Sequence, residues 1–131
     1  MKHPMLVHVT VIGVAGFFGA VARYLVGHYV TQWLGVDKAQ IGTLIINISA
    51  CFLIGLCGTY FARPNHGIPE WTVLAVTTGF IGTYSTFSTY LWEVHKGLTL
   101  GNTITAMGYL FVSIVLGMTG VYLGVQAAKG L

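Results

Sequence analysis

Uncharged stretches and short charged segments alternate along this chain. The uncharged stretches cover residues 3–22, 39–62, 71–92 and 97–128. A helix that crosses a bilayer needs about 20 largely apolar residues, so each stretch is long enough for one crossing. We therefore predict four transmembrane helices, over about 5–33, 40–62, 70–95 and 102–127. The linkers between them are short, and the whole chain, 1–131, is expected to form one all-α transmembrane domain.

The first predicted helix has an alternative interpretation. Lys2, the apolar residues after it and Ala20-Val-Ala22 resemble a secretory signal with a small-residue cleavage site. Against this, apolar residues resume directly after Arg23, and cleavage would leave three spans and a truncated first helix. We therefore interpret this segment as the first transmembrane helix, which continues past Arg23.

The composition is that of an integral membrane protein. Hydrophobic residues make up 55% of the chain and charged residues 7%, whereas soluble domains carry about a quarter charged residues. Cys51 and Cys57 fall on different faces of the second span without a His or Cys neighbour at metal-ligand spacing, so we interpret them as packing residues. The histidines lie at or near predicted helix ends. The basic residues do not cluster, and nucleic acid is therefore not an expected partner.

The basic residues are shared almost evenly between the two sides of the membrane. Four crossings place Lys2, Arg63 and Lys129 on one side, and Lys38, Lys96 and, one or two turns inward, Arg23 on the other. Orientation normally follows an excess of Lys and Arg on the cytoplasmic side. A chain without that excess can insert both ways, and we predict dual topology and an antiparallel homodimer.

Two polar residues inside the spans each allow two interpretations. Arg23 can extend its side chain to the interface, or it can line a water-filled vestibule that attracts an anion. Asn47, near the middle of the second span, can join helices by hydrogen bonds or donate to an anion.

The three acidic residues all fall at predicted span ends: Asp37, Glu70 and Glu93. A proton-coupled exporter of cationic drugs needs a buried acid, so the pattern disfavours a small multidrug-type antiporter, the main alternative function. No nucleophile–base pair or phosphate-binding loop is present either, and we do not expect an enzyme. A non-transporting membrane subunit is a third hypothesis.

The third predicted span contains an unusually polar segment, Gly79 to Tyr90, with the sequence GFIGTYSTFSTY. Seven of the eight residues from Thr83 to Tyr90 carry a hydroxyl group, and two glycines precede them. A membrane helix can break only where protein or water satisfies its backbone. We therefore predict a break near the middle of the membrane, with free carbonyl and N–H groups that form an ion site or pore near Gly82–Ser88. The alternative is a continuous helix whose hydroxyls bond to carbonyls one turn back.

Three segments resemble the Fluc (CrcB) family of fluoride channels. Gly79-Phe-Ile-Gly82 followed by Ser85-Thr-Phe-Ser-Thr-Tyr90 resembles the family's GxxG…TTFSTF signature. Gly19-Ala-Val-Ala-Arg23-Tyr24 is similar to its GAxxR[YW] segment, and Gly42-Thr-Leu-Ile-Ile-Asn47 is similar to its GTLxxN segment. The motifs occur in the family's order, and the resemblance covers essentially the whole chain.

The resemblance implies passive export of cytoplasmic fluoride across the bacterial plasma membrane. The channel would be an antiparallel dual-topology homodimer with two pores along the subunit interface and Arg23 in the vestibule. A central structural sodium ion would bind the backbone carbonyls of Gly82 and Ser85 from each subunit. The residues that match the fluoride path are Asn47, Phe87, Ser88, Thr89, Tyr90, Tyr109 and Ser113.

These residue types suit a small, strongly hydrated anion. A pore must replace the water around fluoride with donors and still release the ion. Amides and hydroxyls can donate, and aromatic ring edges carry the positive part of the quadrupole.

The chain also departs from the family pattern. Tyr90 stands where the signature has Phe, Thr83 replaces a usual Gly, and Ser85 replaces a usual Thr. Gly117, one turn past Ser113, offers no hydroxyl where the path could continue.

Overall fold

The computed structural model describes residues 4–35, 39–64 and 66–131, and the regular structure in these ranges is entirely helical. Three helices are long and apolar enough to cross a membrane: α1 (Pro4–Leu34), α2 (Ala39–Phe61) and α6 (Thr103–Lys129). The prediction of an all-helical membrane protein is confirmed. The positions predicted for Lys2, Asp37 and Lys38 concern residues outside the described ranges.

The region expected to form the third span consists of several shorter pieces. These are α3 (Glu70–Leu74), the π-helix η2 (Ala75–Ile81), α4 (Gly82–Tyr84) and α5 (Phe87–Thr99). The helical course stops after Tyr84, because Ser85 (φ −73°, ψ 160°) and Thr86 (φ −149°, ψ 115°) are extended. Neither half of this region is by itself long enough to count as a membrane-spanning helix.

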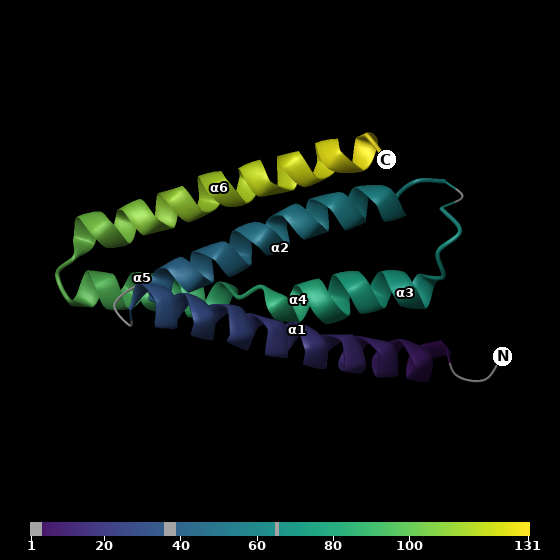
Figure 1. Cartoon of the computed structure of the whole chain (residues 1–131), viewed down its shortest axis with the longest axis horizontal. Coiled ribbons are helices and arrows are strands. Elements are labelled where there is room, and N and C mark those ends of the chain that lie inside the picture. Colours follow the sequence, from purple (N-terminus) through teal and green to yellow (C-terminus); the bar gives the residue numbers. More distant parts are fainter. Residues whose placement is uncertain (1–3, 36–38, 65) are drawn as a thin grey trace.

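The chain runs along the length of the molecule four times (Figure 1). The α1 and α2 helices run in opposite directions, the pieces α3 to α5 follow one another along a third course, and α6 returns alongside α2. As a result, α1 begins at the end of the molecule where α6 finishes.

Glycines bring α2 and α6 into close contact. A β-carbon on Gly55 would collide with the backbone of Val121, and one on Gly124 would collide with the carbonyl of Phe52. Gly120 faces the carbonyl of Ile48, 3.0 Å from where its β-carbon would lie. These glycines therefore form one seam between α2 and α6, of a kind that is common between helices in lipid.

A second seam joins α1 to η2 and α4. Gly19 leaves no room for a β-carbon because the carbonyl of Phe80 and the hydroxyl of Thr83 lie against it, and Gly79 fits beside Ala15 in the same way. The hydroxyl of Thr83 lies 2.9 Å from the carbonyl of Gly16 and 2.8 Å from that of Gly79. The α1 helix is thus an integral part of the bundle. Its interpretation as a transmembrane helix, and not as a cleaved signal, requires such packing.

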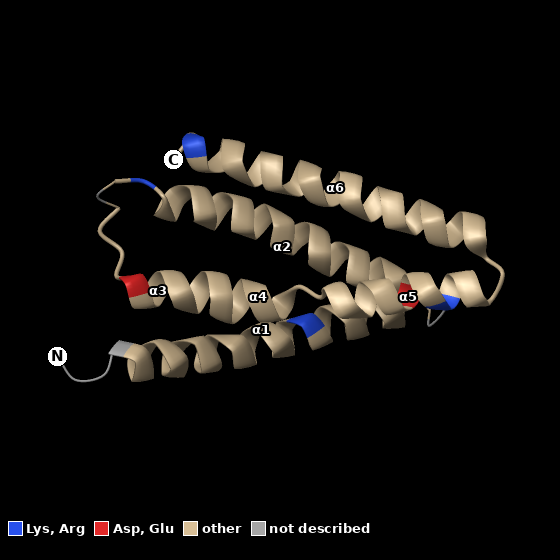
Figure 2. Ribbon diagram, turned by 180° about the vertical axis from the view of Figure 1, so that it is seen from behind, with Lys and Arg blue, Asp and Glu red and all other residues tan. Residues whose placement is uncertain are grey.

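The described charged residues lie mostly near the ends of the helices (Figure 2). Arg63, just after α2, donates a hydrogen bond to the carbonyl of Ala128 at the end of α6. The two exceptions are Arg23 within α1, which contacts Ser85, and Glu93 within α5.

Candidate functional site

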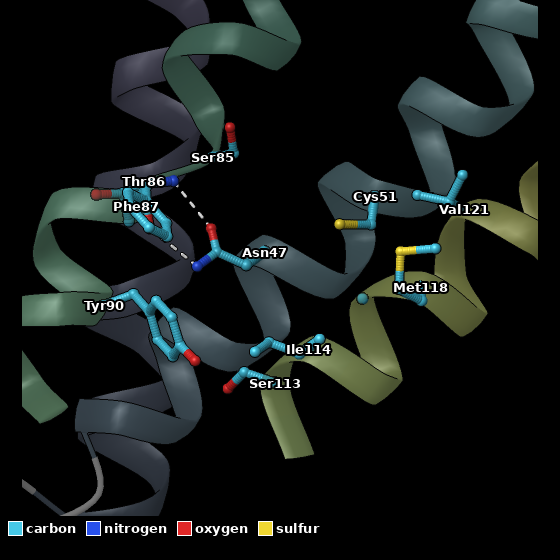
Figure 3. A pocket seen from close by; sticks show the side chains of 11 residues that line it. Asn47, Cys51, Ser85, Thr86, Phe87, Tyr90, Ser113, Ile114, Met118 and Val121 are labelled. Atoms are coloured by element: carbon cyan, nitrogen blue, oxygen red, sulfur yellow. Dashed lines mark hydrogen bonds between the residues drawn. The ribbon is translucent and has the colours of Figure 1, made fainter. Parts of the chain in front are cut away.

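Asn47 on α2 holds the break between α4 and α5, which consists of Ser85 and Thr86, by two hydrogen bonds. The side-chain nitrogen of Asn47 donates to the carbonyl of Thr86 (2.9 Å), and its side-chain oxygen accepts from the Thr86 N–H (2.8 Å; Figure 3). One amide therefore satisfies both backbone groups of a buried, non-helical residue. These bonds agree with the first interpretation of Asn47, in which its amide joins helices. The second N–H of the amide takes no part in the two bonds to Thr86.

Hydroxyl groups secure both sides of the break. Before it, the hydroxyl of the buried Tyr84 lies 2.9 Å from that of Ser49 on α2. After it, the hydroxyl of Thr86 accepts from the N–H of Thr89 (3.3 Å) and donates to the Thr89 hydroxyl (2.9 Å), so Thr86 is the N-cap of α5. The polar run therefore builds the break itself.

The break frees backbone carbonyls from their helical partners, and those of Gly82 and Ser85 are among them. In a continuous helix the Thr86 N–H would bond to the Gly82 carbonyl and the Thr89 N–H to the Ser85 carbonyl. Here the first N–H donates to Asn47 and the second to the Thr86 hydroxyl. The Ser85 carbonyl instead accepts from Nη1 of Arg23 on α1, at 3.2 Å.

These two carbonyls belong to residues that line one small depression, the Gly82 groove. It has a volume of about 210 Å³, and Gly82 and Ser85 share it with Thr77 and with apolar residues of α2. Oxygen ligands are what a hard cation such as sodium prefers. The residues predicted to bind sodium therefore fit that ion in the type of donor they offer.

A larger open groove lies between α2, α5 and α6, and we name it the Asn47 groove; it shares Cys51 and Ser85 with the Gly82 groove. Its volume is about 320 Å³. Its lining includes Asn47, Phe87, Tyr90, Ser113, Ile114 and Met118 (Figure 3). Phe87 projects from the first turn of α5 and is 71% exposed, so its ring forms an accessible wall. The structure thus brings four residues of the predicted fluoride path together.

The protons of the hydroxyls around this groove are not equally available. Tyr90 is buried and donates its hydroxyl proton to the carbonyl of Leu110 on α6, at 2.8 Å. Tyr109 donates its hydroxyl proton to Glu93, also at 2.8 Å. By contrast, the buried hydroxyl oxygen of Ser113 has no hydrogen-bond partner within the described part of the chain. Of these three hydroxyls, that of Ser113 is therefore the one that makes no hydrogen bond to another described residue.

Three residues predicted for the path do not line the Asn47 groove: Ser88, Thr89 and Tyr109. Ser88 and Thr89 are exposed. The hydroxyl of Thr89 is bound to Thr86 in the cap of α5. The spacing of the motif could not reveal this, because a helix that starts at Phe87 turns the next two side chains away from the groove.

The expectation for Glu93 needs correction. Glu93 does not lie at a span end but in the middle of α5, where only 9% of it is exposed. Its carboxylate accepts from the hydroxyls of Thr43 (2.7 Å) and Tyr109 (2.8 Å). The sequence analysis identified Tyr109 as a site residue but not Thr43 or Glu93. The hydrogen bond between Thr43 and Glu93 joins residues 50 positions apart, and a local pattern does not reveal it.

Together these features define an all-helical membrane protein in which two helix ends meet inside the bundle beside a partly polar groove. The family model described as CrcB-like protein, Camphor Resistance (CrcB), matches residues 10–125. The chain belongs to this family, as its motifs predicted.

Relatives of this chain carry the name Fluoride-specific ion channel FluC. The protein from Acidobacterium capsulatum is 41% identical over 113 residues, which cover 86% of this chain and 89% of the relative. The one from Solibacter usitatus is 35% identical, with 90% and 95% covered. The one from Rhizobium meliloti is 32% identical, with 95% and 98% covered. The similarity therefore extends over nearly the full length of both proteins in each pair.

Proposed function

We propose that this protein is a passive, fluoride-selective channel that exports fluoride across the bacterial plasma membrane. The observation that carries the proposal is the Asn47 groove, where a free hydroxyl, an amide and an exposed aromatic ring converge in a chain related to fluoride channels. A weak, dispersed set of donors suits an ion that must be bound and released quickly.

Within this proposal, three groups contact the ion. Ser113 donates its free hydroxyl proton, Asn47 offers the second N–H of its amide, and Phe87 presents its ring edge. Tyr90 contributes its ring while its hydroxyl proton stays on the Leu110 carbonyl. Tyr109 orients its hydroxyl toward Glu93 and so forms the wall of the path rather than a free donor.

The channel is an antiparallel homodimer with two pores in this proposal. The groove is open along one side, and an ion path that faced lipid would leave its polar groups without water or protein. Phe87, Ile114 and Met118 are exposed at the groove and offer an apolar rim to a second copy. The near balance of basic residues at the two ends of the molecule supports insertion in both orientations.

A structural sodium ion at the dimer centre completes the proposal. The freed carbonyls of Gly82 and Ser85 are suitable ligands, and two copies would supply four such oxygens. The ion would neutralise the negative ends of these carbonyl dipoles and hold the two breaks together.

The alternative hypothesis, an antiporter, cannot be rejected for lack of a buried acid, because Glu93 is buried. It is disfavoured because the named relatives are channels and because the carboxylate is occupied by two hydroxyl donors. A cation would have to displace these donors to bind.

Fluoride efflux from proteoliposomes tests the function directly. Vesicles loaded with fluoride and containing the purified protein should release it within seconds after an ionophore removes the opposing voltage, as followed with a fluoride electrode. Vesicles loaded with chloride should release far less of it under the same conditions. A well-folded protein that gives no fluoride efflux above that of empty vesicles contradicts the proposal.

Single cysteines introduced at Lys96 and Lys129 test the topology, in a background that lacks Cys51 and Cys57. These positions lie at opposite ends of the bundle. Dual topology predicts that an impermeant thiol reagent added outside cells labels about half of each variant. Insertion in a single orientation leaves one variant fully labelled and the other unlabelled.

A further inference from the structure

We propose that Arg23 acts as a tethered cation on the central carbonyl site and so sets how tightly that site holds a free cation. The inference rests on the proposed function in one respect, the binding of a cation by the carbonyls of Gly82 and Ser85. It adds a second occupant of that site, supplied by the chain itself.

The position of Arg23 carries the inference. Its Nη1 lies 3.2 Å from the Ser85 carbonyl oxygen and donates to it across 62 residues of sequence. This carbonyl has no helical donor, because the Thr89 N–H that would serve it bonds to the hydroxyl of Thr86. The guanidinium therefore occupies one of the two oxygens that are expected to bind the cation.

A carbonyl oxygen has two lone pairs, so a guanidinium and a cation can both reach it. Their charges have the same sign, however, and they would stand a few ångströms apart in a part-buried site with little water to screen them. Each occupant therefore weakens the other. Because such coupling is reciprocal, a bound cation also favours release of Arg23 from Ser85.

Arg63 provides a matched comparison. It too donates to a backbone carbonyl, that of Ala128, but at the far end of α2, and its guanidinium also stacks over the ring of Tyr60 at 5.3 Å. That contact joins two helix ends and involves neither Gly82 nor Ser85. Loss of Arg63 should therefore affect stability without affecting the cation site.

The test measures sodium binding through thermal unfolding of the full chain in detergent. Sodium chloride replaces N-methylglucamine chloride at constant ionic strength, and the unfolding temperature is followed as sodium rises, since a ligand of the folded state stabilises it. We expect Arg23→Gln to reach half of the sodium effect at a concentration about tenfold lower than the wild type does, a coupling of ordinary size. Arg23→Lys, which keeps the charge but loses the planar fork, should shift in the same direction by about threefold.

Arg63→Gln should lower the unfolding temperature and leave the half-saturating sodium concentration unchanged. The inference is overturned if Arg23→Gln and Arg23→Lys bind sodium as the wild type does or more weakly, or if sodium stabilises none of the proteins. If Arg23→Gln does not fold, the shift or its absence in Arg23→Lys decides. Fluoride efflux by the same wild-type preparation separates the two proposals. Efflux together with an unchanged half-saturating sodium concentration in the Arg23 variants refutes the inference but not the channel. Absence of efflux refutes the channel.

Discussion

Replacement of Phe87 by isoleucine should reduce fluoride efflux at least about a hundredfold, which corresponds to about 2.7 kcal/mol in the barrier. Phe87 is 71% exposed and forms a wall of the Asn47 groove. Isoleucine is apolar and of similar bulk but has no ring, so the positive edge that an anion can face is lost. The rate is measured by fluoride electrode in proteoliposomes at equal protein content.

The matched control is Phe111→Ile. Phe111 is also an exposed aromatic residue, at 61%, but it lies on α6 and does not line the groove. Its replacement should leave the efflux rate within about threefold, and both variants should still fold because neither ring belongs to the buried core of the chain. An undiminished rate in Phe87→Ile would remove this residue from the pore.

Replacement of Asn47 by leucine should abolish efflux and destabilise the protein by about 2–5 kcal/mol. The change removes both hydrogen bonds to Thr86, which is 8% exposed, and leaves a buried N–H and a buried carbonyl unsatisfied. Without this fastening the two helix ends can shift, and the groove loses its amide as well. Thermal unfolding in detergent and efflux in liposomes give the two quantities.

Two further variants separate the roles of Asn47. Asn47→Asp keeps the acceptor for the Thr86 N–H but places a second oxygen against the Thr86 carbonyl, so efflux should remain very low. Ser49→Ala removes the bond from α2 to Tyr84 and should cost only about 1 kcal/mol and leave efflux nearly intact. Wild-type stability in Asn47→Leu would show that the break does not depend on this amide.

The hydroxyl-rich segment illustrates how a sequence can indicate a site and mislead about its parts. Five of its seven hydroxyls form hydrogen bonds that hold the break or join neighbouring helices; they belong to Thr83, Tyr84, Thr86, Thr89 and Tyr90. Their first task is structural. The groove also contains the hydroxyl of Ser113, which makes no hydrogen bond to a described residue and lies far along the chain in α6.

The sequence by itself determined the class of protein, an all-helical membrane protein, and indicated the segment in which Ser85 and Thr86 are extended. Long uncharged stretches must bury their backbone groups in helices when they lie in lipid, and the glycines and hydroxyls of the third stretch mark where a helix can stop. The motifs around Arg23, Asn47 and Phe87 then indicated the family.

Only the tertiary structure decided which polar groups are occupied by other parts of the protein. Hydrogen bonds such as those from Asn47 to Thr86, from Thr43 to Glu93 and from Arg23 to the Ser85 carbonyl join residues 39 to 62 positions apart. A local pattern fixes the face of a helix on which a side chain lies but not what another helix places opposite it. Whether a polar group is free for an ion depends on that neighbour, and the neighbour is set by the packing of the helices.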